Sequence, residues 1–344
     1  MNCTVRCSHY FQSLIIMSSR IKSFLLGLSI LILASSCGDS LQQRKEGDIQ
    51  FIRFERIFMD TPFSHLKDQL SRLRSDFPSP LLTIAPDDSA YLALIANYRN
   101  DSVINALYRA VNSRFPKLDP LERQLTDALE RANNLDNEIV FNHFATAICS
   151  QGYSSRVSAD RENKSLLIAI DQYVVPQMEC FGFFGDPQYI VHLSDSIFIL
   201  SDCMATIANE FIAEPANEPS LLDLMMAEGK KLYFLELTLP HTPDSVRLRY
   251  TDQQYRWMKD NEKQVWSYLI QNKLLYETNY FQYHNLIDEA PKTNAFGDDS
   301  APRSVAFIGW QIVRKYAKKN DITLKDLFAE TDSQKILSQS HYRP

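Results

Sequence analysis

Ser220-Leu-Leu-Asp-Leu-Met-Met-Ala-Glu-Gly-Lys-Lys-Leu-Tyr-Phe-Leu235 is the most clearly helical stretch of this chain. Its apolar residues recur every three to four positions, as on the buried face of an amphipathic helix, at Leu221, Leu224, Met225, Leu232 and Leu235. Ser220 can cap this helix at its start, and Pro240 stops it. Gly229 in its interior costs about 1 kcal/mol relative to alanine. We therefore expect another backbone to approach closely at Gly229.

The sequence that follows predicts more helices. Thr251-Asp-Gln-Gln254 is a capping-box pattern, and the helix that it opens has one predominantly apolar side, with Trp257, Val265, Trp266 and Leu269. Residues 304–318 show the same periodicity, and short helical turns are predicted at 324–328 and 334–338. This half of the chain is therefore expected to be helical.

The preceding part is predicted to be helical as well, apart from two strands. Helices are expected over residues 62–74, from 89 onward, and over 102–112, 121–132, 137–149 and 187–211. Residues 49–58 alternate in part between apolar and polar side chains, which predicts a strand with Arg53 and Glu55 off the core face. Residues 165–174 form a second β-rich run, expected to pair with the first. The predicted fold class is mainly α, or α+β with one small sheet, in a single large helical domain over residues 49–344.

The N-terminal residues predict a bacterial lipoprotein signal. Arg20 and Lys22 precede an apolar run over residues 23–36, and small residues stand directly before Cys37. The run is too short to span a bilayer, which takes roughly 20 apolar residues. Residues 1–36 are thus predicted to be a signal peptide, of which 1–16 form an upstream extension before Met17. Cys37 is the predicted lipidation site, with palmitate among the expected acyl groups, and residues 37–48 are the predicted tether. The alternative is an apolar run with a chance cysteine.

Charge and cysteine content restrict the partners. Removal of residues 1–36 takes away Arg6, Arg20 and Lys22 and no acidic residue, which changes the formal charge from −6 to about −9. This charge argues against nucleic acid as a partner. Among Cys149, Cys180 and Cys203 one disulfide is possible, but buried thiols are expected in these apolar surroundings.

Few patterns in the sequence point to catalysis. Seven histidines are scattered without an HExxH pair, and no GxSxG, P-loop or GxGxxG motif occurs, so no metal ion or other cofactor is expected. A site assembled from the distant His192, His241 and His284 stays open. The candidate acids are Asp171, Glu179, Glu228 and Glu262, whose pairing a sequence cannot reveal. The aromatic clusters 181–184 and 280–283 suit either a ligand or partner surface or the core.

Several segments of the second half resemble the GldB family, the gliding motility-associated lipoproteins of Bacteroidetes. They are residues 168–173, 222–234, 250–257 and 261–266, and a tail that includes Ala301-Pro-Arg-Ser304, Gly309-Trp-Gln-Ile-Val-Arg314 and the final residues 336–344. The resemblance extends more weakly to residue 48. It implies a cell-envelope lipoprotein that supports gliding motility beside the linked secretion machinery, with no established enzyme activity. It also implies a periplasm-facing protein, in the outer membrane rather than the inner one.

The same family looks distantly like zinc peptidases, in which a glutamate before glycine follows an HExxH helix. Glu228-Gly229 would fill that position, but the earlier helix, Ser201-Asp-Cys-Met-Ala-Thr-Ile-Ala-Asn-Glu210, has no histidine. The likeness therefore implies a zincin-like fold without its metal site. Glu228 would then be a structural acid, hydrogen-bonded to a helix start or an arginine. The candidates for a structural or vestigial site are Asp171, Glu228, Gly229, Glu262 and Trp266.

Two hypotheses follow. The first is a non-enzymatic envelope component that binds protein partners in a motility or secretion assembly; its plainest form is a general envelope protein with no motility role. The second is a degenerate hydrolase or pseudoenzyme with a site around Glu228, Glu262 and His192.

Overall fold

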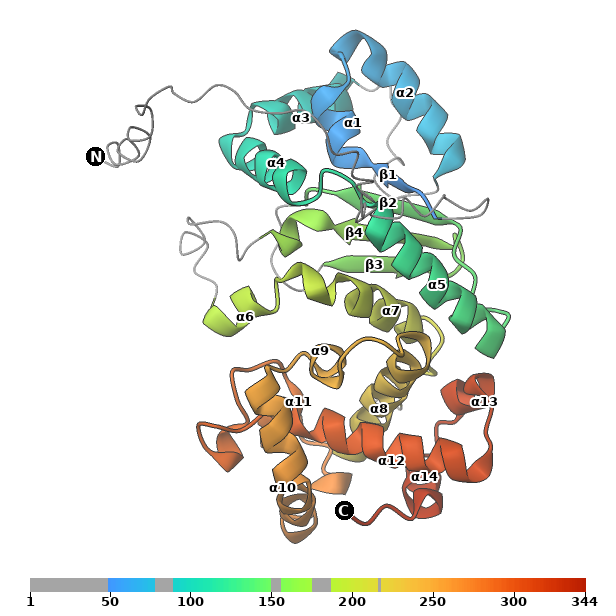
Figure 1. Ribbon diagram of the computed structural model, residues 1–344, viewed down its shortest axis with the longest axis vertical. Helices are drawn as coiled ribbons and strands as arrows, with labels where there is room; N and C mark the ends of the chain where they lie inside the picture. The colour runs from blue at the N-terminus through green and yellow to red at the C-terminus, as the bar shows by residue number, and fades with distance from the viewer. Residues whose placement is uncertain (1–48, 78–88, 150–155, 175–186, 216–217) are drawn as a thin grey trace, which may run out of the picture. The chain divides into compact units, whose positions relative to one another are not determined.

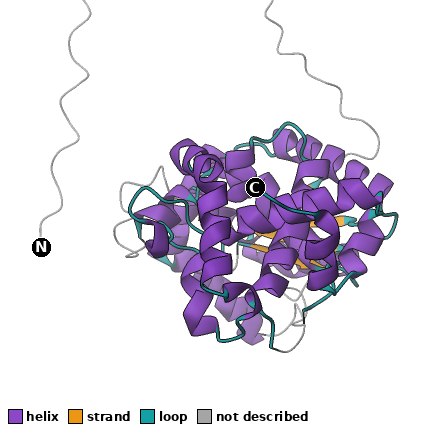
Figure 2. Cartoon of the chain, turned by 90° about the horizontal axis from the view of Figure 1, so that it is seen from below, coloured by secondary structure: helices purple, strands orange, loops and turns teal. Residues whose placement is uncertain are grey.

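The computed structural model describes residues 49–77, 89–149, 156–174, 187–215 and 218–344, all within one unit of the chain, Lys45–Pro344. Helices make up most of the described residues, and the strands form a single small sheet (Figure 2). The predicted fold class, mainly α with one small sheet, is confirmed. The predicted signal peptide, Cys37 and the tether lie outside the described residues.

The sheet is mixed and has the strand order β1-β2-β4-β3 (Figure 1). β1 pairs parallel with β2, β2 pairs parallel with β4, and β3 pairs antiparallel with β4. The strands are β1 (Phe51–Arg53), β2 (His143–Ala147), β3 (Val157–Asp160) and β4 (Ser165–Ala169). Residues 49–58 and 165–174 were predicted to pair directly. This prediction is wrong, because β2 lies between β1 and β4.

The strand predicted over residues 49–58 is limited to β1, and helix α1 (Phe54–Asp60) replaces its second half. Phe54 and Phe58 are four residues apart and therefore lie on the same side of α1, where their rings stack against each other with centroids 5.8 Å apart. Glu55 was expected off the core face, yet it is buried. It accepts hydrogen bonds from Arg53 Nε at 2.7 Å and from Thr146 Oγ1 at 2.9 Å, and these partners make the buried charge tolerable.

The helix predicted over residues 137–149 is also wrong, since this segment contains strand β2. Phe144 packs into the larger of two hydrophobic clusters, whereas Ala145 and Ala147 pack into the smaller one. A strand that is buried on both faces loses the alternation by which strands are identified. The second β-rich run likewise ends early, at Ala169, and continues as a 3-10 helix, Ile170–Tyr173.

Among the described residues, four helices follow α1 before β2 is reached. They are α2 (Phe63–Asp76), α3 (Ser89–Asn100), α4 (Ser102–Arg114) and α5 (Asp119–Leu135). The Asp101 side chain caps α4 by accepting from Val103 N at 2.7 Å and Ile104 N at 3.1 Å. Helices α1, α2 and α3 supply five residues of the smaller cluster: Phe54, Leu66, Leu70, Tyr91 and Ile95. Phe77, directly after α2, and Ala145 and Ala147 of β2 complete it.

The single helix predicted over residues 187–211 is interrupted. The structure has α6 (Gln188–His192), a 3-10 helix (Ser196–Phe198) and α7 (Ile199–Asn209). Asp195 starts the 3-10 helix by accepting from Ile197 N at 3.0 Å. Arg156 donates to the backbone oxygen of Leu193 and to Ser194 Oγ, and these bonds satisfy polar groups at the interruption.

The remaining helices of the described residues are α8 (Leu221–Thr238), α9 (Asp244–Leu248), α10 (Asp252–Gln271), α11 (Tyr280–Ile287), α12 (Ser304–Asn320), α13 (Leu324–Ala329) and α14 (Ser333–Ser340). The predicted helices α8, α10, α12, α13 and α14 are confirmed, whereas α9 and α11 were not predicted. Ser220 caps α8, and Thr251 and Gln254 form the expected capping box at the start of α10. None of the helices among the described residues has the length and apolar content needed to cross a bilayer.

Helices α8 and α12 approach each other through two glycines. A Cβ atom on Gly229 would lie 2.4 Å from the Gly309 backbone oxygen, and a Cβ atom on Gly309 would lie 2.0 Å from the Met225 backbone oxygen. Neither position has room for a side chain, because the opposing atoms belong to the backbone. The predicted close approach at Gly229 is therefore confirmed.

Two of the three cysteines in question can be placed. Cys149 is a free thiol with partial burial, and Cys203 is a free thiol in the larger hydrophobic cluster. Cys180, Glu179 and the aromatic cluster 181–184 lie outside the described residues.

Candidate functional site

Glu228 lies near the middle of α8 with both carboxylate oxygens engaged. Its Oε1 is 2.6 Å from Lys231 Nζ, and its Oε2 is 2.6 Å from Arg303 Nη2. The side chain is 19% exposed. Burial alone would raise the pKa of Glu228, but the Lys231 ammonium and the Arg303 guanidinium outweigh burial and lower this pKa to about 2. Glu228 is thus a firmly ionised carboxylate.

The contact with Arg303 continues into a longer series of charged groups. Glu289 Oε1 lies 3.3 Å from Arg303 Nη1 and 3.4 Å from Arg249 Nε. Arg249 also pairs with Asp202 Oδ1, and Arg156 Nη1 lies 4.0 Å from Asp202 Oδ2. We call this series the ion-pair chain; its members are Lys231, Glu228, Arg303, Glu289, Arg249, Asp202 and Arg156. It joins α8, the start of α12, the segment after α11, the end of α9, α7 and the start of β3.

The aspartate of the ion-pair chain has a further buried partner. The Tyr173 hydroxyl donates to Asp202 Oδ2 at 2.8 Å. Burial and the neighbouring Asp202 carboxylate raise the pKa of Tyr173 well above its usual range, so the hydroxyl keeps its proton and remains a donor. The Arg156 guanidinium lies 5.3 Å from the centre of the Tyr173 ring. The end of the ion-pair chain that Asp202 and Arg156 form is therefore held between the sheet and α7.

Both central arginines occupy unusual backbone positions. Arg249 ends α9 with φ 63°, and Arg303 precedes α12 with φ 45°. The left-handed region costs a residue with a Cβ atom about 1–2 kcal/mol, so other contacts must hold these conformations. One is the hydrogen bond from the Tyr250 hydroxyl to the Arg303 backbone oxygen, at 3.3 Å. The backbone thus fixes the point from which each arginine side chain extends.

Thr293 and Ser300 fold the segment before Arg303 back on itself. Thr293 Oγ1 donates to the Ala301 backbone oxygen at 2.8 Å, and Ser300 Oγ donates to the Thr293 backbone oxygen at 2.8 Å. Both side chains are buried. These bonds connect the chain before α12 independently of any charged group, which helps to position Arg303 for Glu228.

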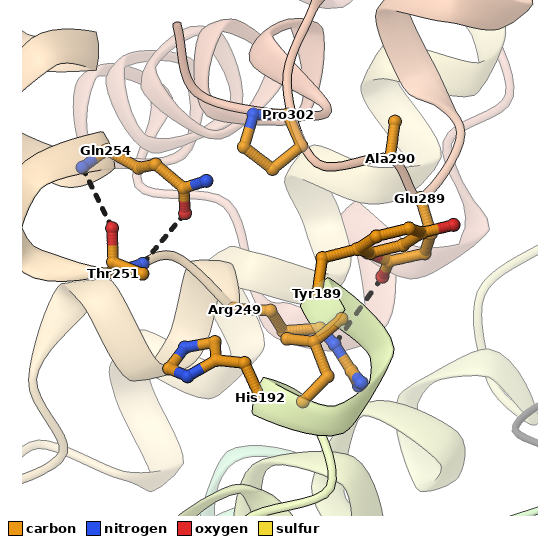
Figure 3. Close-up of a pocket in the computed structure, with 9 residues that line it drawn as sticks. Tyr189, His192, Arg249, Thr251, Gln254, Glu289, Ala290 and Pro302 are labelled. Atoms are coloured by element: carbon orange, nitrogen blue, oxygen red, sulfur yellow. Dashed lines mark hydrogen bonds and ion pairs between the residues drawn. The ribbon is translucent and has the colours of Figure 1, made fainter. Parts of the chain in front are cut away.

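A small pocket of about 80 Å³ opens beside the ion-pair chain (Figure 3). Its polar lining comes from Tyr189, His192, Arg249, Thr251, Gln254 and Glu289. Leu193, Ala290 and Pro302 complete it. Arg249 and Glu289 thus belong to both the pocket and the ion-pair chain.

Glu262 and Trp266 lie elsewhere, on α10, and share Tyr342 as a partner. The Tyr342 hydroxyl donates to Glu262 Oε1 at 2.8 Å, and the Trp266 and Tyr342 rings meet edge to face with centroids 5.1 Å apart. These two residues hold the C-terminal segment against α10, an arrangement that the sequence did not suggest.

Asp171 lies after β4, in the 3-10 helix. It is buried, and it accepts hydrogen bonds from Cys149 N at 3.1 Å and Gln172 Nε2 at 3.2 Å. Burial, with the Asp171 and Glu55 carboxylates, raises the pKa of the Cys149 thiol to about 12. Cys149 is therefore protonated at neutral pH and a poor nucleophile.

The three distant histidines do not share one site. His192 lines the pocket, whereas His284 Nδ1 lies 3.1 Å from the Phe281 backbone oxygen, and His241 is exposed in the turn after α8. Among the described residues, no group of three or more His, Cys, Asp or Glu side chains could hold a metal ion.

Six members of the ion-pair chain were not predicted as site residues: Lys231, Arg303, Glu289, Arg249, Asp202 and Arg156. No spacing between these charged residues marks them as parts of one site, and they meet only in the folded chain. The expectation that Glu228 binds an arginine or a helix start gave a partial signal, since Arg303 is an arginine at the start of α12.

Comparison with known proteins gives one match. A family model described as gliding motility protein GldB matches residues 39–344. No curated protein and no solved structure matches the chain.

Proposed function

Because the chain belongs to the GldB family of gliding motility proteins, we propose that it supports gliding as a non-enzymatic binding component of the cell envelope. Its partners would be proteins of the motility or secretion apparatus. A lipid on Cys37 would hold it at the membrane, facing the periplasm and in the outer membrane rather than the inner one. The family's description as a motility protein supports the first part of this proposal, and the signal at residues 20–37 supports the second.

The engagement of Glu228 carries the non-enzymatic part. A general acid or base works best with a pKa near the operating pH and needs access to the reacting group. Glu228 has a pKa lowered to about 2 and both oxygens within 2.6 Å of a cation. Such a carboxylate is suited to joining helices, because it neither takes up a proton near pH 7 nor presents a free oxygen.

Carboxylates on α7 and α8 are both neutralised by arginines. Asp202 of α7 pairs with Arg249, and Glu228 of α8 pairs with Arg303. If this fold descends from a zinc peptidase, the guanidinium groups of Arg249 and Arg303 now balance the carboxylate charges on α7 and α8 that a metal ion would otherwise balance. This interpretation supports a structural role for Glu228-Gly229.

The second hypothesis, a degenerate hydrolase around Glu228, Glu262 and His192, has no comparable support. Glu262 is bonded to Tyr342, and His192 lies beside Arg249 rather than beside Glu228. Elemental analysis of the purified protein addresses it directly, because about one zinc per chain would revive this hypothesis.

A binding component needs an accessible surface, and the two most exposed large apolar side chains of the described residues lie close together in sequence. Phe281 is 83% exposed and Tyr276 is 61% exposed, and Tyr280 stands next to Phe281 at the start of α11. Exposed aromatic residues of this kind are enriched where proteins meet. Residues 280–283 thus divide between the two interpretations, because Tyr280 and Phe281 are exposed whereas Tyr283 is buried in the core.

Complementation of a deletion strain tests the proposal. Wild-type protein and a folded Glu228→Gln variant should both restore spreading and secretion, because Glu228 has no catalytic part. Cys37→Ala should lose detergent-phase partitioning and restore neither. Normal spreading and secretion in the deletion strain would contradict the motility role, and a folded but inactive Glu228→Gln protein would contradict the non-enzymatic role.

Crosslinking in intact cells tests the partners. We expect capture of motility or secretion components by the tethered protein, and reduced capture by a Phe281→Ser variant. Ile197→Ser is a matched control, since Ile197 is an exposed apolar residue in another segment. Equal reduction by both variants would show that the start of α11 is not the binding surface.

A further inference from the structure

The pocket beside the ion-pair chain has the features of a site for one small anionic group. We infer that it binds a carboxylate, which pairs with Arg249 in the position that Glu289 partly fills. This inference goes beyond the proposed function, because it concerns a ligand chemistry and not the motility role.

Arg249 is positioned to receive such a group. It lines the pocket, and its guanidinium is anchored by the pair with Asp202 and lies 5.8 Å from the centre of the Phe198 ring. Its backbone is fixed at the end of α9. A planar guanidinium held in this way is pre-organised for a carboxylate, so little side-chain entropy is lost on binding.

Glu289 is the most loosely held carboxylate of the ion-pair chain. Its contacts with the two arginines are 3.3 and 3.4 Å long, whereas Glu228 has two contacts of 2.6 Å. Charged hydrogen bonds between nitrogen and oxygen usually measure about 2.7–2.9 Å. Glu289 is 28% exposed, against 8% for Asp202. An incoming carboxylate therefore competes with the weakest internal anion.

The size and lining of the pocket suit a single carboxylate. A volume of about 80 Å³ accommodates a group such as acetate and is small beside the roughly 300–1,000 Å³ of a pocket for a drug-sized ligand. The polar groups of Thr251 and Gln254 already bond to each other's backbone nitrogens, and Gln254 Nε2 donates to Pro291 O at 3.1 Å. These side chains form a fixed wall, so selectivity rests on the charge of Arg249.

The test uses the full-length protein in detergent and sodium acetate as the probe, with affinity measured by saturation-transfer NMR. Acetamide is the matched neutral probe, because it has the same shape without the charge. We expect acetate to bind at least about tenfold more tightly than acetamide. Equal binding of the two would overturn the inference.

Two variants and a control sharpen the result. Glu289→Gln removes the internal competitor and should tighten acetate binding about tenfold, which an unfolded protein could not do. Arg249→Gln should abolish acetate binding, and His241→Asn, at an exposed histidine outside the pocket, should change nothing. Unchanged or weaker acetate binding by folded Glu289→Gln protein would overturn the inference.

The source of the carboxylate is decided by a second set of probes. Short peptides with a free C-terminus, with an amidated C-terminus, or with one glutamate side chain are compared with acetate. Tighter binding of one acidic peptide would assign the site to a protein partner, and no gain over acetate would assign it to a free small acid. Either result supports a carboxylate site, and binding of the amidated neutral peptide as tightly as acetate would contradict it. These measurements need no motility assay, so their failure is distinguishable from failure of the proposed function.

Discussion

Arg303 Nη2 lies 2.6 Å from Oε2 of Glu228, and this pair links the start of α12 to the middle of α8. The two helices also touch backbone to backbone through Gly229 and Gly309. A charged contact and a close-packed contact therefore fix the same pair of helices. Each can be removed separately.

Glu228→Gln should reduce the loss of folding stability that the wild-type protein shows as pH falls below about 4.3. The folded-state pKa of Glu228 is lowered to about 2, below the unfolded value near 4.3, so its contribution is complete above about pH 4.3 and is lost as pH falls toward 2. The shift corresponds to on the order of 3 kcal/mol. Urea unfolding of both proteins at several pH values between 2 and 7 measures the difference.

Glu138→Gln is the control for this experiment, because Glu138 pairs with Lys325 and Arg161 at the exposed surface. Its effect should be much smaller, since solvent screens such pairs. Equal effects of the two substitutions would show that the contacts of Glu228 add no more to stability than an exposed ion pair does.

Gly229→Ala should destabilise the protein, although alanine is the better helix former by about 1 kcal/mol. The new Cβ atom would meet the Gly309 backbone oxygen at 2.4 Å, and backbone cannot move aside as a flexible side chain can. We expect a loss of at least about 2 kcal/mol in urea unfolding.

Gly297→Ala separates steric clash from backbone strain. Gly297 has φ 91° and no atom near its Cβ position, so only backbone strain, of about 1–3 kcal/mol, is expected. A Gly229→Ala protein as stable as wild type would disprove the close helix contact.

Lys230→Met should remove a rise in stability at alkaline pH. Burial lowers the pKa of Lys230 to about 8, and the Glu330 carboxylate opposes this only in part. Between about pH 8 and 10.4 the unfolded chain holds a proton here that the folded protein has released, so folding stability rises with pH. The difference between wild type and variant should change by about 3 kcal/mol over this window. A constant difference would show that Lys230 stays charged.

Tyr342→Phe and Tyr342→Ala test the C-terminal contact with α10. Loss of the hydrogen bond to Glu262 should cost about 1 kcal/mol, and loss of the ring against Trp266 should bring the total to about 3 kcal/mol. Thermal unfolding measures both. Arg343→Ala, at the exposed neighbouring residue, should have no effect, and equal stability of all three variants would assign no structural role to Glu262 and Trp266.

Much of the helical part could be predicted from the sequence. Helices α8 and α10 combine apolar periodicity with capping residues, whereas α12 was predicted from its periodicity alone. The predictions failed where tertiary contacts override this pattern. β2 is buried on both faces, and residues 187–211 are interrupted where Arg156 satisfies the backbone.

The site was harder to predict than the fold. The position of Glu228 before a helical glycine gave a signal, and its partner Arg303 was anticipated only as some arginine. Asp202, Arg249 and Glu289 come from three separate segments, and no local pattern marks residues that meet through the arrangement of helices. The burial of Glu55, on a segment that was expected to be a strand, was missed for the same reason.

The parallel pairing of β1 with β2 has a consequence for the order of folding. Phe51 lies opposite Phe144, and all of α1 to α5 comes between them along the chain. During synthesis from the N-terminus, the first strand therefore remains unpaired while those helices emerge. Pairings this distant form slowly. Until then the partly synthesised chain exposes an unpaired strand edge and the apolar faces of its helices, through which it could associate with other chains. A chaperone that holds unfolded chains protects this kind of intermediate.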